Sequence, residues 1–340
     1  TGFKLIPIVH DPILDWHTSQ IRVYYYRQIR HQLSIMRLFK AAATGLIALT
    51  SVGLVACQKS APTNETGASG QTGNVFETGK LRAVVVDDVL PMVDEKDGKY
   101  EGLSFVVLNA IRDQLKSATE NKSDDIVIEP VSIKSAQDGL NKIRSGEADI
   151  ACGVAFTWER QRTLTYSLPF ATSGVRVLAP KGNDGTPESL KGKTIGVVKD
   201  TAAAAVLAKS VDDAQFQFFS TPTEALAGLK DGTVEFLGGD SLWLKASRQA
   251  TAPDADLVPT FPYARSSVGC VVANTTPHLL NYSNLAIGRM LTAYVDDNKE
   301  VRTAVNQWIG PDSQVGLSEN MIGDFFTIVL ATTAELSKGS

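Results

Sequence analysis

Hydrophobic positions from about residue 80 onward fall into two alternating patterns. The short apolar run at 81–86 is typical of a buried strand, and residues 192–198 begin the same pattern again. Segment 102–117 instead carries apolar residues three or four positions apart, which is typical of a helix with one buried face. Because the two patterns alternate along the chain, the sequence predicts helices packed on a mostly parallel α/β sheet.

A unit made of a helix, a glycine and a strand occurs twice at identical spacing. Its positions are Leu140, Ile143, Gly146 and Ile150 in the first copy and Leu226, Leu229, Gly232 and Phe236 in the second. The first strand leads to Arg160 and the second to Asp240. Open α/β sheets bind ligands at the carboxyl ends of strands, so the units predict two lobes that present opposite charges. A surface ion pair is the alternative for Arg160, and such units are common in α/β proteins.

The chain before residue 80 shows no pattern of a folded domain. Residues 1–35 are interpreted as an upstream extension outside the mature protein. Residues 36–56 run from Met through two basic residues into an apolar stretch that ends directly before Cys57. This order resembles a bacterial lipoprotein signal peptide, which implies cleavage before Cys57 and lipidation of its thiol; an ordinary secretory signal is the alternative. Residues 57–79, rich in Ser, Thr, Asn and Gly, predict a flexible tether.

Composition argues against several function classes. The chain is 43% hydrophobic and 21% charged with a formal net charge of −4, which does not favour nucleic-acid binding. No cysteine and histidine spacing is typical of zinc sites, so neither a metal nor a cofactor is predicted. The sequence contains no P-loop and no nucleophile elbow, and it is not interpreted as an enzyme.

Several motifs in a fixed order carry a resemblance to a known family. They are Gly-Glu-Ala-Asp-Ile at 146–150, Thr-Trp-Glu-Arg at 157–160, Tyr-Ser-Leu-Pro-Phe at 166–170, Lys-Gly-Lys-Thr-Ile-Gly-Val at 191–197 and Trp-Ile-Gly at 308–310. Together they resemble the bacterial extracellular solute-binding proteins of the polar amino-acid type, family 3, across about residues 80–310. The resemblance implies a type II periplasmic-binding-protein fold, in which two α/β lobes joined by two hinge strands close on a ligand.

The resemblance also implies domain bounds. We expect the first lobe at 80–175, the second lobe at 176–269, and a return to the first lobe followed by a C-terminal tail at 270–340. The hinge strands are expected near residues 174–178 and 268–272.

Four residues of this chain match ligand-binding positions of the family. Arg160 matches the residue that binds the ligand carboxylate, because its planar fork fits a carboxylate with two hydrogen bonds. Asp240 matches the acid that binds the α-ammonium group. Gly153 matches a position whose backbone N–H helps to bind the carboxylate, and Thr201 matches a turn that begins a helix facing the ligand.

Other positions depart from the family pattern. Ala155 stands where a Ser or Thr donates a hydroxyl group, and Val89 stands where an aromatic residue stacks on the ligand. Trp158 or Trp243 is a candidate for the missing aromatic wall, although packing in the core is the favoured interpretation of Trp243. Asp88, at the end of the first strand, is a further candidate for ligand binding.

The pairing of Cys152 and Cys270 stays open at this stage. Both lie near the expected lobe junction, and an extracytoplasmic location permits a disulfide. Two buried thiols are the alternative, because spacing along the sequence does not determine the distance between the Cα atoms.

The resemblance implies a lipid-anchored, monomeric binding protein in the periplasm or at the cell surface. It captures a small amino-acid-like zwitterion and delivers it to an ABC permease. One alternative is a sensor or binding module without a permease, because residues 152–160 resemble an orphan branch found beside glycine-rich-repeat peptide maturation genes. Another is an enzyme on the same fold, similar to cyclohexadienyl dehydratase, with Asp87, Asp88 or Glu159 as candidate acids or bases.

Overall fold

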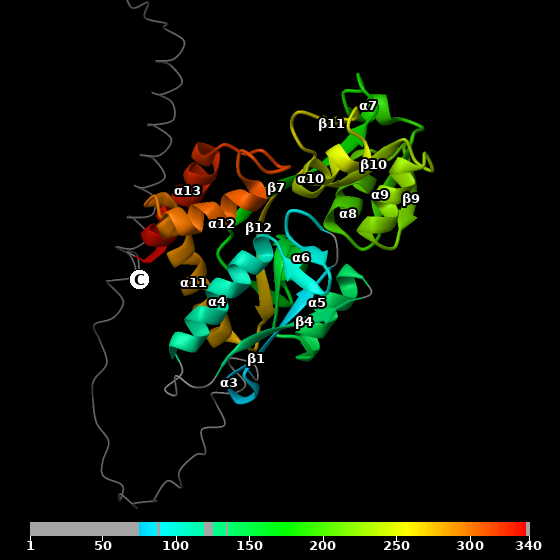
Figure 1. Ribbon diagram of the computed structural model, residues 1–340. Coiled ribbons are helices and arrows are strands. Elements are labelled where there is room, and N and C mark those ends of the chain that lie inside the picture. The colour runs from blue at the N-terminus through cyan, green and yellow to red at the C-terminus, as the bar shows by residue number, and fades with distance from the viewer. Residues whose placement is uncertain (1–74, 87–88, 119–124, 134, 338–340) are drawn as a thin grey trace, which may run out of the picture. The chain divides into compact units, whose positions relative to one another are not determined.

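The computed structural model describes residues 75–337 apart from 87–88, 119–124 and 134 (Figure 1). The predicted extension, signal peptide and lipidation site Cys57, most of the predicted tether, and Asp87 and Asp88 therefore lie outside the described residues. Within the described part of the chain, no helix is both long enough and apolar enough to cross a membrane.

The structure consists of strands and helices that alternate along most of the chain. The strands are β1 (Lys80–Val85), β2 (Asp94–Lys96), β3 (Lys99–Glu101), β4 (Val127–Ser132), β5 (Ile150–Ala155), β6 (Leu164–Tyr166), β7 (Ala171–Ala179), β8 (Thr194–Val198), β9 (Gln215–Phe219), β10 (Phe236–Asp240), β11 (Asp256–Val258) and β12 (Arg265–Ala273). The helices are α3 (Val75–Thr78), α4 (Leu103–Ala118), α5 (Ala136–Ser145), α6 (Trp158–Gln161), α7 (Pro187–Leu190), α8 (Ala202–Ser210), α9 (Pro222–Lys230), α10 (Ser241–Thr251), α11 (Pro277–Val295), α12 (Lys299–Ile309) and α13 (Glu319–Ser337).

One continuous sheet, in the order β4-β1-β5-β12-β7-β10-β8-β9, runs through both lobes. In the first lobe, β4, β1 and β5 are parallel, and β12 pairs antiparallel with β5. In the second lobe, β10, β8 and β9 are parallel. The predicted arrangement of two α/β lobes is confirmed, and the structure adds an antiparallel strand to each lobe, β12 beside β5 and β7 beside β10.

Strand β7 connects the two lobes because its halves have different partners. Its residues 171–174 pair with β12, whereas residues 175–178 pair with β10. The second connection lies beside this point, where Tyr263 and Ala264 exchange backbone hydrogen bonds with Val175. The sequence placed this connection at 268–272, but in the structure these residues pair with β5 and β6 inside the first lobe. An apolar run predicts that a strand is buried, not which lobe buries it.

Alternate residues of the strands face different helices. Leu81 and Val85 of β1 belong to the cluster formed with α4 and α11, whereas Val84 belongs to the cluster formed with α5. Phe236 and Leu237 of β10 divide in the same way between the α8 cluster and the cluster of α9 and α10. Both lobes are therefore sheets covered by helices on two faces, which explains their nearly continuous apolar strands.

Helix ends follow the capping signals in the sequence. Ser135 accepts a hydrogen bond from the Asp138 amide at the start of α5, and Gly146 ends that helix with φ of 77°. At α9, Thr221 accepts from the Glu224 amide while the Glu224 carboxylate accepts from the Ser220 amide.

Asp149 has a structural role. Its carboxylate is buried, accepts from the Arg82 backbone at 2.8 Å and pairs with the Arg82 guanidinium at 2.6 Å. These bonds hold the start of β5 against β1.

Helices lie in the segment interpreted as a tether and in the segment interpreted as a C-terminal tail. Residues 75–79 were included in the tether, but Val75 is fully buried and α3 contacts β1. The predicted C-terminal tail contains α13, whose Phe326 packs edge-on against Tyr294 with ring centroids 5.1 Å apart. Glu319 accepts hydrogen bonds from Arg302 and Asn306 at the start of α13. Val75 of α3 and Ile322, Phe326 and Val329 of α13 belong to the buried core of the first lobe.

Candidate functional site

The strands that carry the two predicted charges end beside the same stretch of β7. Val268 pairs with Ala155 at the end of β5 and also with Ala171, at the start of β7. Asp240, at the end of β10, pairs with Val175. Through its pairing with β12, strand β5 runs in the same direction as β7, whereas β10 runs in the opposite direction. The carboxyl ends of β5 and β10 therefore meet at residues 171–175 of β7, one from each lobe. The register therefore places the Arg160 loop and Asp240 on either side of the connection.

Arg160 is positioned by the end of β5. Thr157 caps α6 by accepting a hydrogen bond from the Arg160 amide. The guanidinium folds back, and its Nη1 donates to the Ala155 carbonyl at 3.0 Å. Arg160 is half-buried and has no acidic partner among the described residues. The guanidinium is therefore not neutralised by any acid among the described residues.

Tyr166 is a site residue that the sequence analysis did not single out. Its hydroxyl donates to the same Ala155 carbonyl at 2.9 Å, which brings it next to Arg160. Burial raises the pKa of Tyr166, and the positive charge of Arg160 opposes that rise. The position was visible in the sequence only as part of the Tyr-Ser-Leu-Pro-Phe motif.

An aromatic group lies beside the Arg160 loop. Phe156 packs against Trp158 with ring centroids 5.0 Å apart and against Tyr166 at 5.1 Å. The Trp158 side chain is 76% exposed, so one of its faces is accessible to a ligand. Trp243, the other candidate, is buried with Leu178 and Leu237, so it packs in the second lobe.

Gly153 is the extra residue of a β-bulge. Cys152 pairs with Cys270 and Val154 with Gly269, which leaves Gly153 without a counterpart in β12. Its φ is 87°, and a Cβ atom there would lie 2.8 Å from the Ser104 hydroxyl oxygen. Only glycine fits this conformation and this close approach. The Ser104 hydroxyl is itself buried and has no hydrogen-bond partner in the described part of the chain.

Asp240 caps the helix that follows it. One carboxylate oxygen, Oδ1, accepts from the Leu242 amide at 2.9 Å and from the Trp243 amide at 3.3 Å. Burial raises the pKa of Asp240, against the lowering effect of the Ser173 hydroxyl and these two amides. No basic side chain of the residues described in the structure pairs with it.

Thr201 caps α8 in the second lobe. Its hydroxyl donates to the Val198 carbonyl at 2.7 Å and accepts from the Ala204 amide at 3.2 Å. These bonds hold the turn in shape. Asp200, which precedes it, has a left-handed φ of 62°, at a position where glycine is the ordinary choice.

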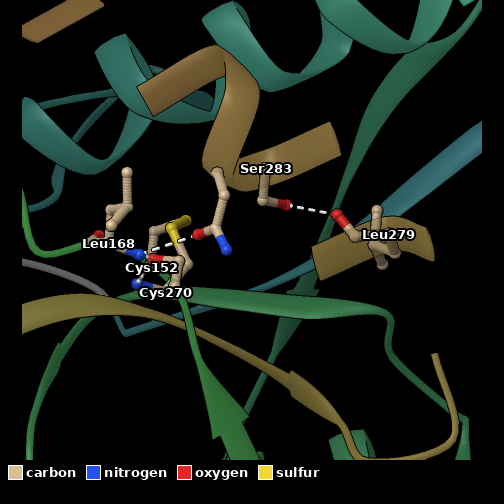
Figure 2. The surroundings of a disulfide bond; sticks show 7 residues. Cys152, Leu168, Cys270, Leu279 and Ser283 are labelled. Atoms are coloured by element: carbon tan, nitrogen blue, oxygen red, sulfur yellow. Dashed lines mark hydrogen bonds between the residues drawn. A yellow bond between two sulfur atoms is a disulfide. The ribbon is translucent and has the colours of Figure 1, made fainter. Parts of the chain in front are cut away.

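A disulfide joins Cys152 and Cys270 directly across the β5–β12 pair (Figure 2). Their Cα atoms are 3.9 Å apart although 118 positions separate them in the sequence. The bond lies next to the Gly153 bulge and therefore braces the strand that leads to Arg160. Among the described residues, no cluster of three or more His, Cys, Asp or Glu side chains is arranged to hold a metal ion.

Comparison with known proteins identifies the fold and the family. The model of the bacterial extracellular solute-binding proteins, family 3, matches residues 81–311, more than half of the chain. A relative, the virulence sensor protein BvgS of Bordetella bronchiseptica, is 24% identical over 226 residues. That match covers 64% of this chain but only 16% of BvgS, so the chain spans a small part of the relative's length.

Two solved structures show the fold. The amino acid ABC transporter substrate-binding protein AbpA from Streptococcus pneumoniae, bound to L-arginine, matches with a TM-score of 0.58 and 18% identity, over 68% of this chain and 95% of AbpA. The ancestral amino acid-binding protein AncCDT-1, described as a precursor of cyclohexadienyl dehydratase, also has a TM-score of 0.58, with 20% identity over 70% of this chain and 98% of its own. The type II periplasmic-binding-protein fold is thereby confirmed.

Proposed function

The chain belongs to the bacterial extracellular solute-binding proteins of family 3, and on this premise we propose that it binds an amino acid or a derivative between its two lobes. The ligand is a zwitterion whose carboxylate contacts Arg160 and whose ammonium group contacts Asp240. AbpA, which has the same fold, is bound to L-arginine.

The observation that carries the proposal is the pair of unpartnered opposite charges on either side of residues 171–175. Neither Arg160 nor Asp240 has an oppositely charged partner among the described residues. A zwitterion supplies both missing partners at once. Leaving a charge half-buried and unpaired is costly, so the site gains when such a ligand enters.

The carboxylate half of the site is preorganised. The bond from Arg160 to the Ala155 carbonyl fixes the direction of the guanidinium before any ligand binds. Ala155 offers no hydroxyl donor, so Arg160 provides a larger share of the hydrogen bonds to the ligand carboxylate than it would if this residue were Ser or Thr. The bulge at Gly153 leaves a position in β5 without a counterpart in β12, which supports a role for its backbone N–H as a second donor.

The ammonium half depends on the ionised form of Asp240. Burial favours the protonated form, and a cation placed against the carboxylate reverses that preference. Because each lobe holds one charge, a ligand that spans both lobes favours their closed arrangement over an open one. The exposed Trp158 ring, which packs against Phe156, is suited to contact the ligand side chain.

Calorimetry with the standard amino acids tests this proposal on matched pairs of variants. Arg160→Ala and Asp240→Ala should each weaken binding tens- to thousands-fold, the usual effect of removing one member of a desolvated charge pair. The controls Arg162→Ala and Asp254→Ala remove exposed side chains of the same type and should bind normally. Arg160→Lys should also weaken binding, because a point charge does not reproduce the guanidinium fork. Affinity close to wild type in Arg160→Ala would contradict the proposal that Arg160 binds the ligand carboxylate.

We further propose that the protein is anchored outside the cytoplasm through a lipid on Cys57, acts as a monomer and passes its ligand to an ABC permease. An alternative is a sensor or binding module without a permease, favoured by the similarity to part of the sensor BvgS. Uptake of the labelled ligand by cells with and without the protein separates the two. Loss of uptake supports delivery to a permease, and unchanged uptake supports the sensor.

Catalysis is a second alternative, favoured only by the shared fold with the dehydratase precursor AncCDT-1. NMR spectra of the bound amino acid, recorded before and after prolonged incubation with the protein, decide between binding and turnover. New product signals that disappear in Arg160→Ala would establish an enzyme.

A further inference from the structure

A cavity of about 420 Å³ lies where β7, the N-terminal end of α10 and the C-terminal segment meet. Its lining includes residues 170–174 of the connection between the lobes, but neither Arg160, Asp240, Gly153 nor Thr201. Cavities of this size hold small organic molecules in other proteins.

One part of the cavity wall is apolar. Every residue that the segment after residue 308 contributes is apolar, and Leu317, Met321 and Phe325 are among them. The Met321 side chain is 61% exposed, and Phe325 is only partly buried. The segment that the sequence predicted to be a tail thus forms an apolar surface facing the connection between the lobes.

The other part of the wall is cationic. Arg176, Lys245 and Arg265 line the cavity, and no acidic residue does. None of the three forms an ion pair with an acid in the described part of the chain. Arg176 donates from Nη2 to the Thr260 carbonyl at 2.6 Å, but its Nε is buried and has no hydrogen-bond partner among the described residues.

These cations disfavour one another. Burial and the charge of Arg265 lower the pKa of Arg176. Burial, together with the charges of Arg176 and Arg248, lowers the pKa of Lys245. An anion in the cavity would relieve this repulsion and accept from the unpaired Nε, while an apolar body would cover the surface of the C-terminal segment.

We propose that this cavity is a second binding site, which uses neither Arg160 nor Asp240, for a small amphiphilic anion such as a carboxylate on an alkyl or aryl body. The anionic group contacts Arg176 and Lys245, and the apolar body contacts Leu317, Met321 and Phe325. The ligand lies against residues 171–174 of β7. The cavity shares neither Arg160 nor Asp240 with the proposed amino-acid site, so the two proposals are tested separately.

Octanoate is the probe, and calorimetry of the full chain is the measurement. Octanoate should bind saturably at one site. Octanol, acetate and octylammonium should each bind at least tenfold more weakly, because octanol lacks the negative charge, acetate lacks the alkyl body and octylammonium carries a positive charge. Lys245→Gln should weaken octanoate binding about tenfold, the effect of losing one hydrogen bond to a charged group. Lys209→Gln, an exposed lysine in the same lobe, is the matched control and should not change it.

Two further variants keep the test decisive. Phe325→Ala should weaken octanoate binding and leave acetate binding unchanged. Arg160→Ala should leave octanoate binding intact, which distinguishes this site from the proposed amino-acid site at Arg160. The proposal is overturned if octanoate does not saturate, if octanol binds equally well, or if Lys245→Gln behaves as Lys209→Gln does. Loss of octanoate binding in Arg160→Ala would also overturn it.

Discussion

The disulfide between Cys152 and Cys270 should provide a large part of the stability of the first lobe. It closes a loop of 118 positions that contains the whole second lobe. In the chain-entropy model, a crosslink over that separation removes unfolded-state entropy worth about 5 kcal/mol at 25 °C. The two cysteines already pair directly in the β5–β12 ladder, so the bond requires no additional ordering of the native chain.

Urea unfolding, followed by circular dichroism, measures this contribution. The double variant Cys152→Ala/Cys270→Ala should lose up to about 5 kcal/mol of unfolding free energy. With a slope of about 2–3 kcal/mol per molar urea, the midpoint should fall by about 2 M. Reductant should lower the wild-type midpoint by a similar amount and should have no effect on the double variant, which serves as the control.

The outcome separates stabilisation through the unfolded state from a local effect on the site. A midpoint shift below about 0.3 M would refute the loop-closure reasoning, because it corresponds to less than about 1 kcal/mol. A large shift with unchanged ligand affinity would mean that the bond holds the lobe together without positioning the Arg160 loop.

Three further predictions concern single positions. Gly153→Ala should destabilise the protein by at least about 1–2 kcal/mol in thermal unfolding, because alanine disfavours a φ of 87° and its Cβ would meet the Ser104 hydroxyl. Adding Ser104→Ala to this variant should recover the part of the loss that is due to the clash. Full stability of Gly153→Ala would contradict the bulge geometry. The raised pKa of Asp240 means that its contribution to stability is fully present below its unfolded-state pKa and is lost as pH rises through the folded-state value. In the ligand-free protein, the melting temperature of the wild type relative to that of Asp240→Asn should therefore rise as pH falls from 7 toward 4. A difference that does not change with pH would be inconsistent with a pKa of Asp240 raised by burial. Cys57→Ser should abolish acyl labelling and shift the protein from the membrane to the soluble fraction or leave an uncleaved precursor; unlabelled wild type would exclude lipidation.

Local sequence signals predicted much of the fold. The apolar run at 192–198 contains β8, Thr194–Val198, and segment 102–117 corresponds to α4, Leu103–Ala118. Gly146 and Ser135 mark helix ends because capping depends on side chains only a few positions away. The ordered motifs were specific enough to indicate the family and fold, and they drew attention to Arg160 and Asp240 as the charged residues that follow two equivalent strands.

Features that depend on partners far along the chain were decided by the tertiary structure. Spacing left the pairing of Cys152 and Cys270 open, whereas strand register places them opposite each other. The bulge at Gly153 exists only because β12 supplies one residue fewer than β5. The second connection at 263–264, in place of 268–272, and the cavity beside Arg176 likewise arise from which strands and helices meet. A sequence specifies burial and local turns through near neighbours, but register and cavities are set by contacts between segments that lie far apart in the sequence.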